Sequence, residues 1–222
     1  MKKSLISSSQ QSKSISIVGG GELTRSCLPS ICASDVCIGV DRGALWLIRH
    51  HIVPDISIGD FDSVSMRERA DITASGTRVM AYPSEKDATD LELAVGEAIR
   101  LKARQVFLFG VLGRRFDHGM GAIAALRRLV SHNIYGEIVD NFSKINIVRR
   151  EKKKFSRDPV YPYISVLPLT NRTLLTLSGF RYNVSKKVFS LQSTVGISNE
   201  IPGSSATVTV HNGAALIVRS RD

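Results

Sequence analysis

A short apolar run that ends in glycine or a carboxylate recurs through the first half of the chain, and it constrains the fold more than any other feature. The clearest copy is Ile56–Ser63, where an apolar run reaches Gly59 and is followed by Asp60 and Asp62. Side chains two apart on a strand point the same way, so Asp60 and Asp62 should face one point while Phe61 turns to the core. Two carboxylates on one side suit a divalent cation such as Mg²⁺. The alternative is a plain turn, because Asp, Gly and Ser are common turn residues.

Other strand ends carry residues that bind ions or phosphate. A triple glycine that includes Gly20 follows Ile15–Val18, and glycine lets the backbone approach an anion closely. Its spacing matches neither the dinucleotide fingerprint nor the Walker loop. Asp41 follows Val36–Val40, and the loop after the run at 105–110 holds Arg115, Asp117 and His118. Strands that alternate with helical segments predict a mostly parallel sheet with helices on both faces, and ligands beyond the strands' carboxyl ends.

A further pair of acids, Asp87 and Asp90, precedes a helix marked by apolar residues from Leu91 to Ile99. Acids in a first helical turn also cap free amides and complement the helix dipole, so capping and function are equal alternatives. Arg115 is able to bind phosphate with two hydrogen bonds, while Asp117 either orients it or holds a substrate hydroxyl. A simple loop ion pair is the other interpretation of Arg115 and Asp117.

Helical periodicity stops in the last third of the chain. Short alternating runs replace it, and Asn212-Gly213 is a hairpin signal between the last two. We therefore expect an α/β fold with an N-terminal parallel sheet and a smaller C-terminal all-β domain, a sandwich or barrel. The expected divisions are a flexible polar tail at 1–14, an α/β domain at 15–148 and a β domain at 149–222.

Composition excludes several classes of protein. The chain has 222 residues, 43% hydrophobic and 23% charged, and no apolar run of the ~20 residues that cross a bilayer. The Ser-rich segment after Met1-Lys2-Lys3 cannot serve as the apolar part of a signal peptide, so a cytoplasmic location is expected. Cys27, Cys32 and Cys37 lack the close pairs of zinc sites and are expected to be reduced thiols.

The net charge of +10 raises the alternative of nucleic-acid binding. The basic residues are scattered except in Arg149–Lys154, which no aromatic motif for stacking bases accompanies. A solvated linker is the favoured interpretation of this run.

Taken together and in order, five motifs resemble those of thiamine pyrophosphokinases: Asp41-Arg42-Gly43, Gly59–Ser63, Lys86–Glu92, Gly113–His118 and Ser193–Glu200. The resemblance covers nearly the whole chain after the tail. It implies transfer of the pyrophosphoryl group of ATP to the hydroxyethyl oxygen of thiamine, with release of AMP. It also implies an α/β catalytic domain, a β-sandwich domain, and a homodimer that binds thiamine between its subunits.

The resemblance also implies roles for individual residues. Mg²⁺ and the phosphates would be held by Asp60, Asp62, Asp87 and Asp90, and catalysis would involve Asp60, Asp62, Asp90 and Arg115. Substrates would be bound by Asp41, Asp117, His118, Tyr182, Ser198 and Asn199, with Asp41 near thiamine and Tyr182 stacking on it. Gly20 joins the expected substrate-binding residues on the strength of the glycine loop alone. Ala122 departs from the family pattern, which often has asparagine there, and the tail and the lysines at 152–154 have no assigned chemistry.

Two other functions remain possible from the residues alone. Repeated acids and the Asp117-His118 pair suggest a metal-dependent phosphoesterase, although the remaining histidines lack acid-rich motifs. The basic charge suggests a nucleic-acid-binding protein whose affinity falls steeply with salt.

Overall fold

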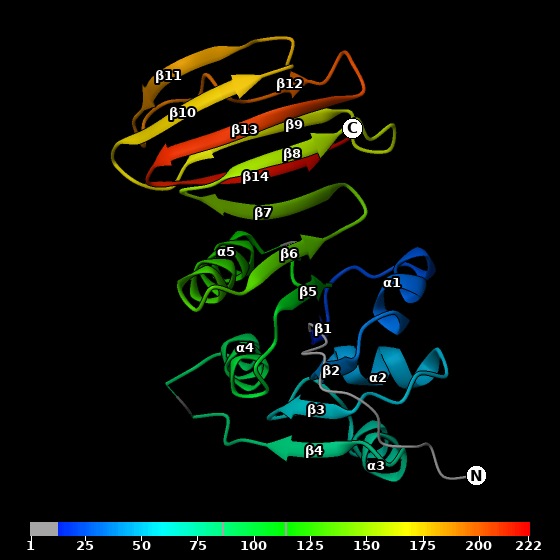
Figure 1. Ribbon diagram of the computed structural model, residues 1–222. Coiled ribbons are helices and arrows are strands. Elements are labelled where there is room, and N and C mark those ends of the chain that lie inside the picture. The colour runs from blue at the N-terminus through cyan, green and yellow to red at the C-terminus, as the bar shows by residue number, and fades with distance from the viewer. Residues whose placement is uncertain (1–12, 86, 114) are drawn as a thin grey trace, which may run out of the picture.

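The computed structural model describes residues 13–85, 87–113 and 115–222 (Figure 1). Most of the expected tail at 1–14 lies outside the described residues, and Ser14 already belongs to the first strand. None of the helices in the described ranges is long and apolar enough to cross a membrane.

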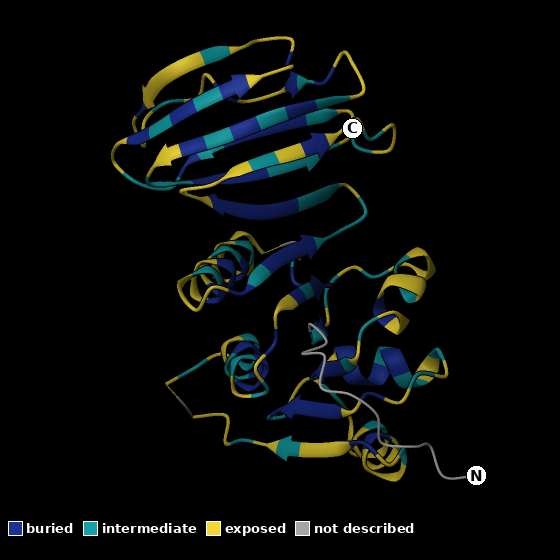
Figure 2. Cartoon of the chain, viewed as in Figure 1, coloured by how far each residue is buried: buried dark blue, intermediate teal, exposed yellow. Residues whose placement is uncertain are grey.

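The N-terminal half forms a parallel sheet, as the alternation of strands and helices predicts. Its strands are β1 (Ser14–Val18), β2 (Val36–Val40), β3 (Ile56–Gly59), β4 (Arg78–Ala81), β5 (Gln105–Phe109) and β6 (Tyr135–Val139). They are ordered β6-β5-β1-β2-β3-β4. Figure 2 shows β3 and β6 as buried and β4, at the edge, as largely exposed.

Helices cover both faces of this sheet (Figure 1). They are η1 (Arg25–Cys27), α1 (Leu28–Cys32), α2 (Arg42–Arg49), α3 (Met66–Ala74), α4 (Asp90–Arg100) and α5 (Phe116–Ser131). Neighbouring residues of β2 point to opposite faces: Ile38 packs in the core that contains α4 and α5, and Cys37 packs with Leu47 of α2. The fold therefore has two apolar layers, one on each side of the strands.

The sheet continues into the C-terminal half through four more strands. These are β7 (Ser143–Arg149), β14 (Ala214–Ser220), β9 (Tyr163–Pro168) and β12 (Asn199–Glu200), which complete a ten-stranded sheet. A second, four-stranded antiparallel sheet consists of β11 (Val184–Phe189), β10 (Thr173–Ser178), β13 (Ser205–Asn212) and β8 (Lys152–Ser156). Buried residues of both sheets, among them Val166 and Val208, share one core. The expected fold class is confirmed, while the division at 148–149 remains a prediction because one sheet runs through both regions.

Two local expectations are wrong. The basic run Arg149–Lys154 is exposed except at Lys153, as expected, but it is not a linker: it runs from the end of β7 in the large sheet into β8, an edge strand of the small one. Lysines on an edge strand discourage pairing with other chains. Asn212-Gly213 does not join a hairpin either, because β13 and β14 belong to different sheets. Gly213, with φ 82°, provides the corner at which the chain crosses between the sheets.

Candidate active site

Three carboxylates meet beyond the carboxyl ends of the parallel strands. Asp41 follows β2, Asp60 follows β3 and Asp90 opens α4, and one oxygen of each lies within 4.8 Å of the others. All three side chains are half-buried. This acid triad, Asp41, Asp60 and Asp90, offers the hard oxygen ligands that a divalent cation prefers.

The backbone at Asp41 directs its side chain into the triad. Asp41 has φ 45°, a conformation that L residues rarely adopt, and its Oδ1 accepts a hydrogen bond of 3.2 Å from the amide of Phe61. Gly59 leaves the space this requires, since a Cβ there would lie 1.8 Å from Asp41 Oδ1. The resemblance placed Asp41 near thiamine, and its membership of the acid triad was missed. The sequence signal was available, because Asp41 follows a strand end just as Asp60 does.

Burial and neighbouring negative charges together perturb the pKa of Asp41. Burial raises its pKa from 3.8 to about 7, and the negative charges of Asp90 and Asp60 add to the rise. The hydrogen bond from the Phe61 amide opposes it. A cation in the acid triad would relieve this repulsion.

Asp62 and Asp87 are exposed, and neither belongs to the acid triad. The expectation that strand alternation aims Asp60 and Asp62 at one point is wrong, because β3 ends at Gly59 and Phe61 has φ 59°. Phe61 does turn into the core, where it is 3% exposed. The amide of Asp62 donates to Asp60 Oδ1 at 3.1 Å, so this turn orients the Asp60 carboxylate.

The cap of α4 shows how Asp90 reaches the acid triad. Thr89 and Glu92 form a capping box, in which Thr89 Oγ1 accepts from the Glu92 amide and the Glu92 carboxylate accepts from the Thr89 amide. Helix capping is therefore done by the neighbours of Asp90. Its carboxylate instead lies beside Asp41 and Asp60.

Glycines pack the strand-end loops tightly against one another. The amides of Gly19 and Gly21 donate to carbonyl oxygens of Phe109 and Gly110, each at 2.8 Å. A Cβ at Gly43 would lie 2.0 Å from the Val18 carbonyl oxygen. Gly20 is exposed, and of the three consecutive glycines it is the candidate to offer its backbone to a phosphate.

Arg115 and Asp117 form an exposed pair at the start of α5. The guanidinium donates to both carboxylate oxygens, and the pair lowers the pKa of Asp117. Their side chains are 69% and 62% exposed, and His118 beside them is also exposed. Ala122, one turn further along, is fully buried and contributes to the core. Arg114 lies outside the described residues.

The C-terminal motif lies at the opposite end of the ten-stranded sheet. Tyr182 is 61% exposed, and its amide donates to Oδ1 of the buried Asn199 at 3.0 Å. Ser198 has φ 54° and is exposed, and its amide donates to Ser165 Oγ at 3.0 Å. The structure thus brings Tyr182, Ser198 and Asn199 together, as the motif implies.

Strand register measures how far this motif lies from the acid triad. Direct partners lead from β12 to β2 in one row along the same edge of the sheet: Asn199, Ile164, Arg219, Lys144, Val139, Phe109, Val18 and Gly39. Seven strand spacings of about 4.8 Å separate the two ends by roughly 34 Å along the sheet. Within one chain, the two sets of residues are too far apart to hold reacting groups together.

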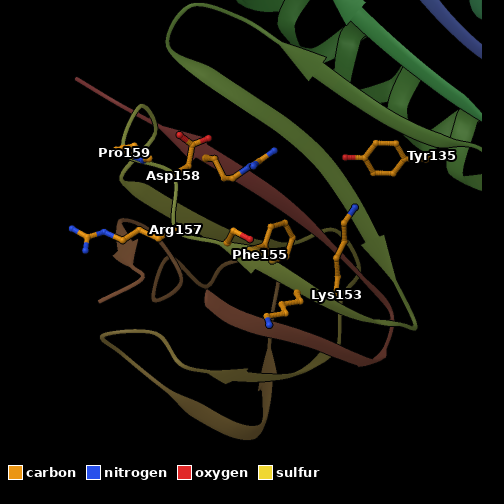
Figure 3. Close-up of a pocket in the computed structure, with 9 residues that line it drawn as sticks. Tyr135, Lys153, Phe155, Arg157, Asp158 and Pro159 are labelled. Atoms are coloured by element: carbon orange, nitrogen blue, oxygen red, sulfur yellow. The ribbon is translucent and has the colours of Figure 1, made fainter. Parts of the chain in front are cut away.

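A separate hollow of about 300 Å³ lies beside β8 (Figure 3). Lys153 extends toward Tyr135, and its ammonium lies 4.0 Å from the centre of that ring. Burial lowers the pKa of Lys153. Glu137, which is nearby, accepts a hydrogen bond of 2.6 Å from Arg219. One lysine of the basic run is thus part of the contact between the two sheets.

Comparison with known families accounts for both ends of the sheet. The family model described as "Thiamin pyrophosphokinase, catalytic domain" matches residues 30–137, which include the acid triad. The model described as "Thiamin pyrophosphokinase, vitamin B1 binding domain" matches residues 144–217, which include Tyr182 and Asn199. The chain belongs to the thiamine pyrophosphokinase family. It is a transferase that makes thiamine diphosphate, as the resemblance implies.

Individual relatives agree with this assignment. The thiamine pyrophosphokinase of Bacillus subtilis is 33% identical over 215 residues, covering 95% of this chain and all of that protein. A crystal structure of that enzyme superposes with a TM-score of 0.87 at 34% identity, over 95% of this chain and all of the other. The structure from Geobacillus thermodenitrificans gives 0.84 at 32% identity, over 94% and 98%. Nothing in these comparisons supports a phosphoesterase or a nucleic-acid-binding protein.

Proposed function

We propose that the acid triad holds the metal-bound phosphates of ATP while thiamine is presented by the Tyr182 end of a second copy of the chain. Thiamine pyrophosphokinase activity uses ATP as a co-substrate. The observation that carries the proposal is the meeting of Asp41, Asp60 and Asp90 at the strand ends.

The acid triad fits Mg²⁺ in its donor chemistry. It offers carboxylate oxygens within 4.8 Å of one another, and the negative charges of Asp90 and Asp60 add to the rise that burial causes in the pKa of Asp41. Asp60 and Asp90 would hold the ion with Asp41, and Asp62 and Asp87 stand near enough in sequence to contribute further oxygens. When bound, Mg²⁺ would neutralise phosphate charge and allow the nucleotide to approach these acids.

Residues of the other strand ends would orient the nucleotide. Arg115 is exposed, and its guanidinium is held by Asp117 in an orientation from which it can hydrogen-bond phosphate oxygens. Gly20 would offer its backbone, and His118 would lie beside the nucleotide. Positioning and charge stabilisation are the main protein contributions to phosphoryl-type transfer.

The reaction breaks one P–O bond and forms another. The hydroxyethyl oxygen of thiamine attacks the β-phosphorus of ATP, and the bond from that phosphorus to the oxygen of the α-phosphate breaks. The electron pair leaves with AMP, and the hydroxyl proton passes to a carboxylate of the site. Asp60, Asp62 and Asp90 are the candidate acceptors, and such a base contributes about 10² to 10⁴ in rate.

A homodimer would bring the distant ends of the sheet together. The roughly 34 Å between Asn199 and β2 prevents one chain from completing the site alone. Exposed apolar side chains gather in the C-terminal motif region, including Tyr182, Leu191, Val195 and Ile197, and others stand at the start of α5, at Phe116 and Met120. Burial of these groups between two copies would be favourable. Thiamine would then bind at the end of one copy that carries Tyr182, Ser198 and Asn199 and receive pyrophosphate at the acid triad of the other. We place this enzyme in the cytoplasm, as the sequence suggests.

Product analysis tests the proposal directly. The protein is incubated with Mg-ATP, with and without thiamine, and the nucleotides are separated. We expect AMP and thiamine diphosphate in equal amounts, and only when thiamine is present. ADP as the sole nucleotide product, or AMP formed equally without thiamine, would contradict it.

A further inference from the structure

The side chain of Asn199 forms hydrogen bonds with the backbone of the loop 179–183, which joins β10 to β11 and carries Tyr182. We call it the Tyr182 loop. Its Oδ1 accepts from the amides of Tyr182 and Glu200, both at 3.0 Å, and its Nδ2 donates to the Tyr182 carbonyl oxygen at 2.8 Å. These backbone partners fix which end of the amide faces which group. Three of the four hydrogen bonds that the side chain can make are therefore inside the protein, and Asn199 is 4% exposed.

The loop that Asn199 holds is fixed at each neighbouring residue. Phe180 is 2% exposed, and its amide donates to Asn183 Oδ1 at 3.0 Å. Arg181 donates from its backbone to the Glu200 carbonyl oxygen at 2.9 Å and from its guanidinium to the Glu200 carboxylate at 2.8 Å. The loop is thereby attached to β12 along its length.

The ring of Tyr182 is what this anchoring presents to the outside. Both the amide and the carbonyl oxygen of Tyr182 are hydrogen-bonded to Asn199, while 61% of the residue is exposed. The Arg181 guanidinium lies 5.6 Å from the ring centre, which further restricts the ring. A large exposed aromatic ring on an immobilised backbone suits a planar ligand, because little conformational freedom is lost when the ligand stacks.

We infer that Asn199 is a positioning residue, which acts on thiamine through Tyr182 and does not contact thiamine itself. This inference rests on the proposed role of Tyr182 in thiamine binding. It separates Asn199 from Ser198, which is exposed and adjacent in the same motif.

A double-mutant cycle on thiamine KM distinguishes positioning from contact. Asn199→Ala, Tyr182→Ala and the double variant are compared with wild type at saturating Mg-ATP. We expect Asn199→Ala to raise the KM for thiamine about tenfold, as expected from the loss of its hydrogen bonds to Tyr182, with the KM for ATP unchanged. In the Tyr182→Ala background, the same change should alter the thiamine KM by less than about twofold, because the ring it positions is absent.

Two results would overturn the inference, and they have different consequences for the proposed function. If Asn199→Ala and Tyr182→Ala raise the KM for thiamine by factors that multiply in the double variant, Asn199 contacts thiamine directly, and the proposed function survives. If Tyr182→Ala leaves the thiamine KM unchanged, the assignment of Tyr182 fails, and the inference fails with it.

Two further variants complete the test. Asn199→Asp keeps the volume and the acceptor but turns a carboxylate oxygen toward the Tyr182 carbonyl oxygen, so it should raise the KM for thiamine at least as much as Asn199→Ala, and only while Tyr182 is present. Asn212→Ala is the matched control. Asn212 accepts from Arg150 at 3.4 Å at a distant corner of the same sandwich, and its loss should leave the KM for thiamine unchanged.

Discussion

Replacement of Asp41 by asparagine should change how the stability of the metal-free protein depends on pH. The pKa of Asp41 is about 7 in the folded protein, against 3.8 ordinarily, so the folded state holds a proton that the unfolded state has released. Stability contributed by this group therefore falls as pH rises from about 4 to about 7 and levels off above that. Asparagine keeps an oxygen for the Phe61 amide and removes the titration.

The size of the effect follows from the shift. Between pH 5 and pH 8, the contribution of Asp41 to the free energy of unfolding changes only up to its pKa of about 7, that is, over about two pH units. At 1.36 kcal/mol per unit, this change amounts to about 2.7 kcal/mol. Asp41 is partly exposed, and screening by water reduces the expected effect to about 1.5 kcal/mol. Asp41→Asn should thus be more stable, relative to wild type, at pH 8 than at pH 5 by about this amount.

Urea unfolding at the two pH values in EDTA measures this difference. Excess Mg²⁺ provides the second arm: at pH 8 it should stabilise wild type more than Asp41→Asn, because the variant has lost one ligand of the acid triad. Parallel pH dependence of the two proteins in EDTA would refute the claim that burial and the charges of Asp90 and Asp60 raise the pKa of Asp41.

Three other substitutions test separate parts of the structure. Asp90→Asn should lower AMP release at least about a hundredfold without unfolding the protein, whereas Asp71→Asn on α3 should leave the rate unchanged; equal rates would remove Asp90 from the site. Gly43→Ala should destabilise the protein by about 3 kcal/mol or more in thermal unfolding, since the added Cβ would lie 2.0 Å from a carbonyl oxygen. In the control Gly119→Ala, in α5, the added Cβ has no atom within 4 Å, so this variant should be more stable by up to about 1 kcal/mol. Arg115→Ala should raise the KM for ATP and change stability by less than about 1 kcal/mol, because its ion pair with Asp117 is exposed; an unchanged KM would contradict its role.

The sequence predicts the regular part of this fold well. Apolar runs and helical periodicity locate the parallel strands and α4 to within a few residues, because each must present an apolar face to the core. The start of α5, at Phe116, is hard to locate from sequence because Gly119 and Gly121 weaken the helical signal in its first turns. The strand β8 was missed because its lysines lie on an edge, where burial does not select apolar residues.

Site geometry is less predictable because it depends on unusual backbone conformations. The acids at successive strand ends were found from sequence, and Asp60 and Asp90 do meet. The alternation of side chains along a strand predicts the wrong direction for the Asp62 side chain, because the strand ends at Gly59 and Phe61 adopts φ 59°. Asp41 joins the acid triad through φ 45°, which no periodicity indicates. The internal role of the Asn199 side chain depends on contacts with a loop 17 residues away in sequence.

Subunit complementation tests most directly whether the active site is shared between two chains. Asp60→Asn is expected to be nearly inactive as a homodimer, and Tyr182→Ala is expected to be nearly inactive when thiamine is kept far below its raised KM. When equal amounts are mixed and allowed to exchange subunits, a heterodimer contains one site in which both Asp60 and Tyr182 are intact. We expect recovery of about a quarter of wild-type activity, because about half the dimers are heterodimers and each has one working site of two. No recovery, with exchange demonstrated by differently tagged chains, would contradict it.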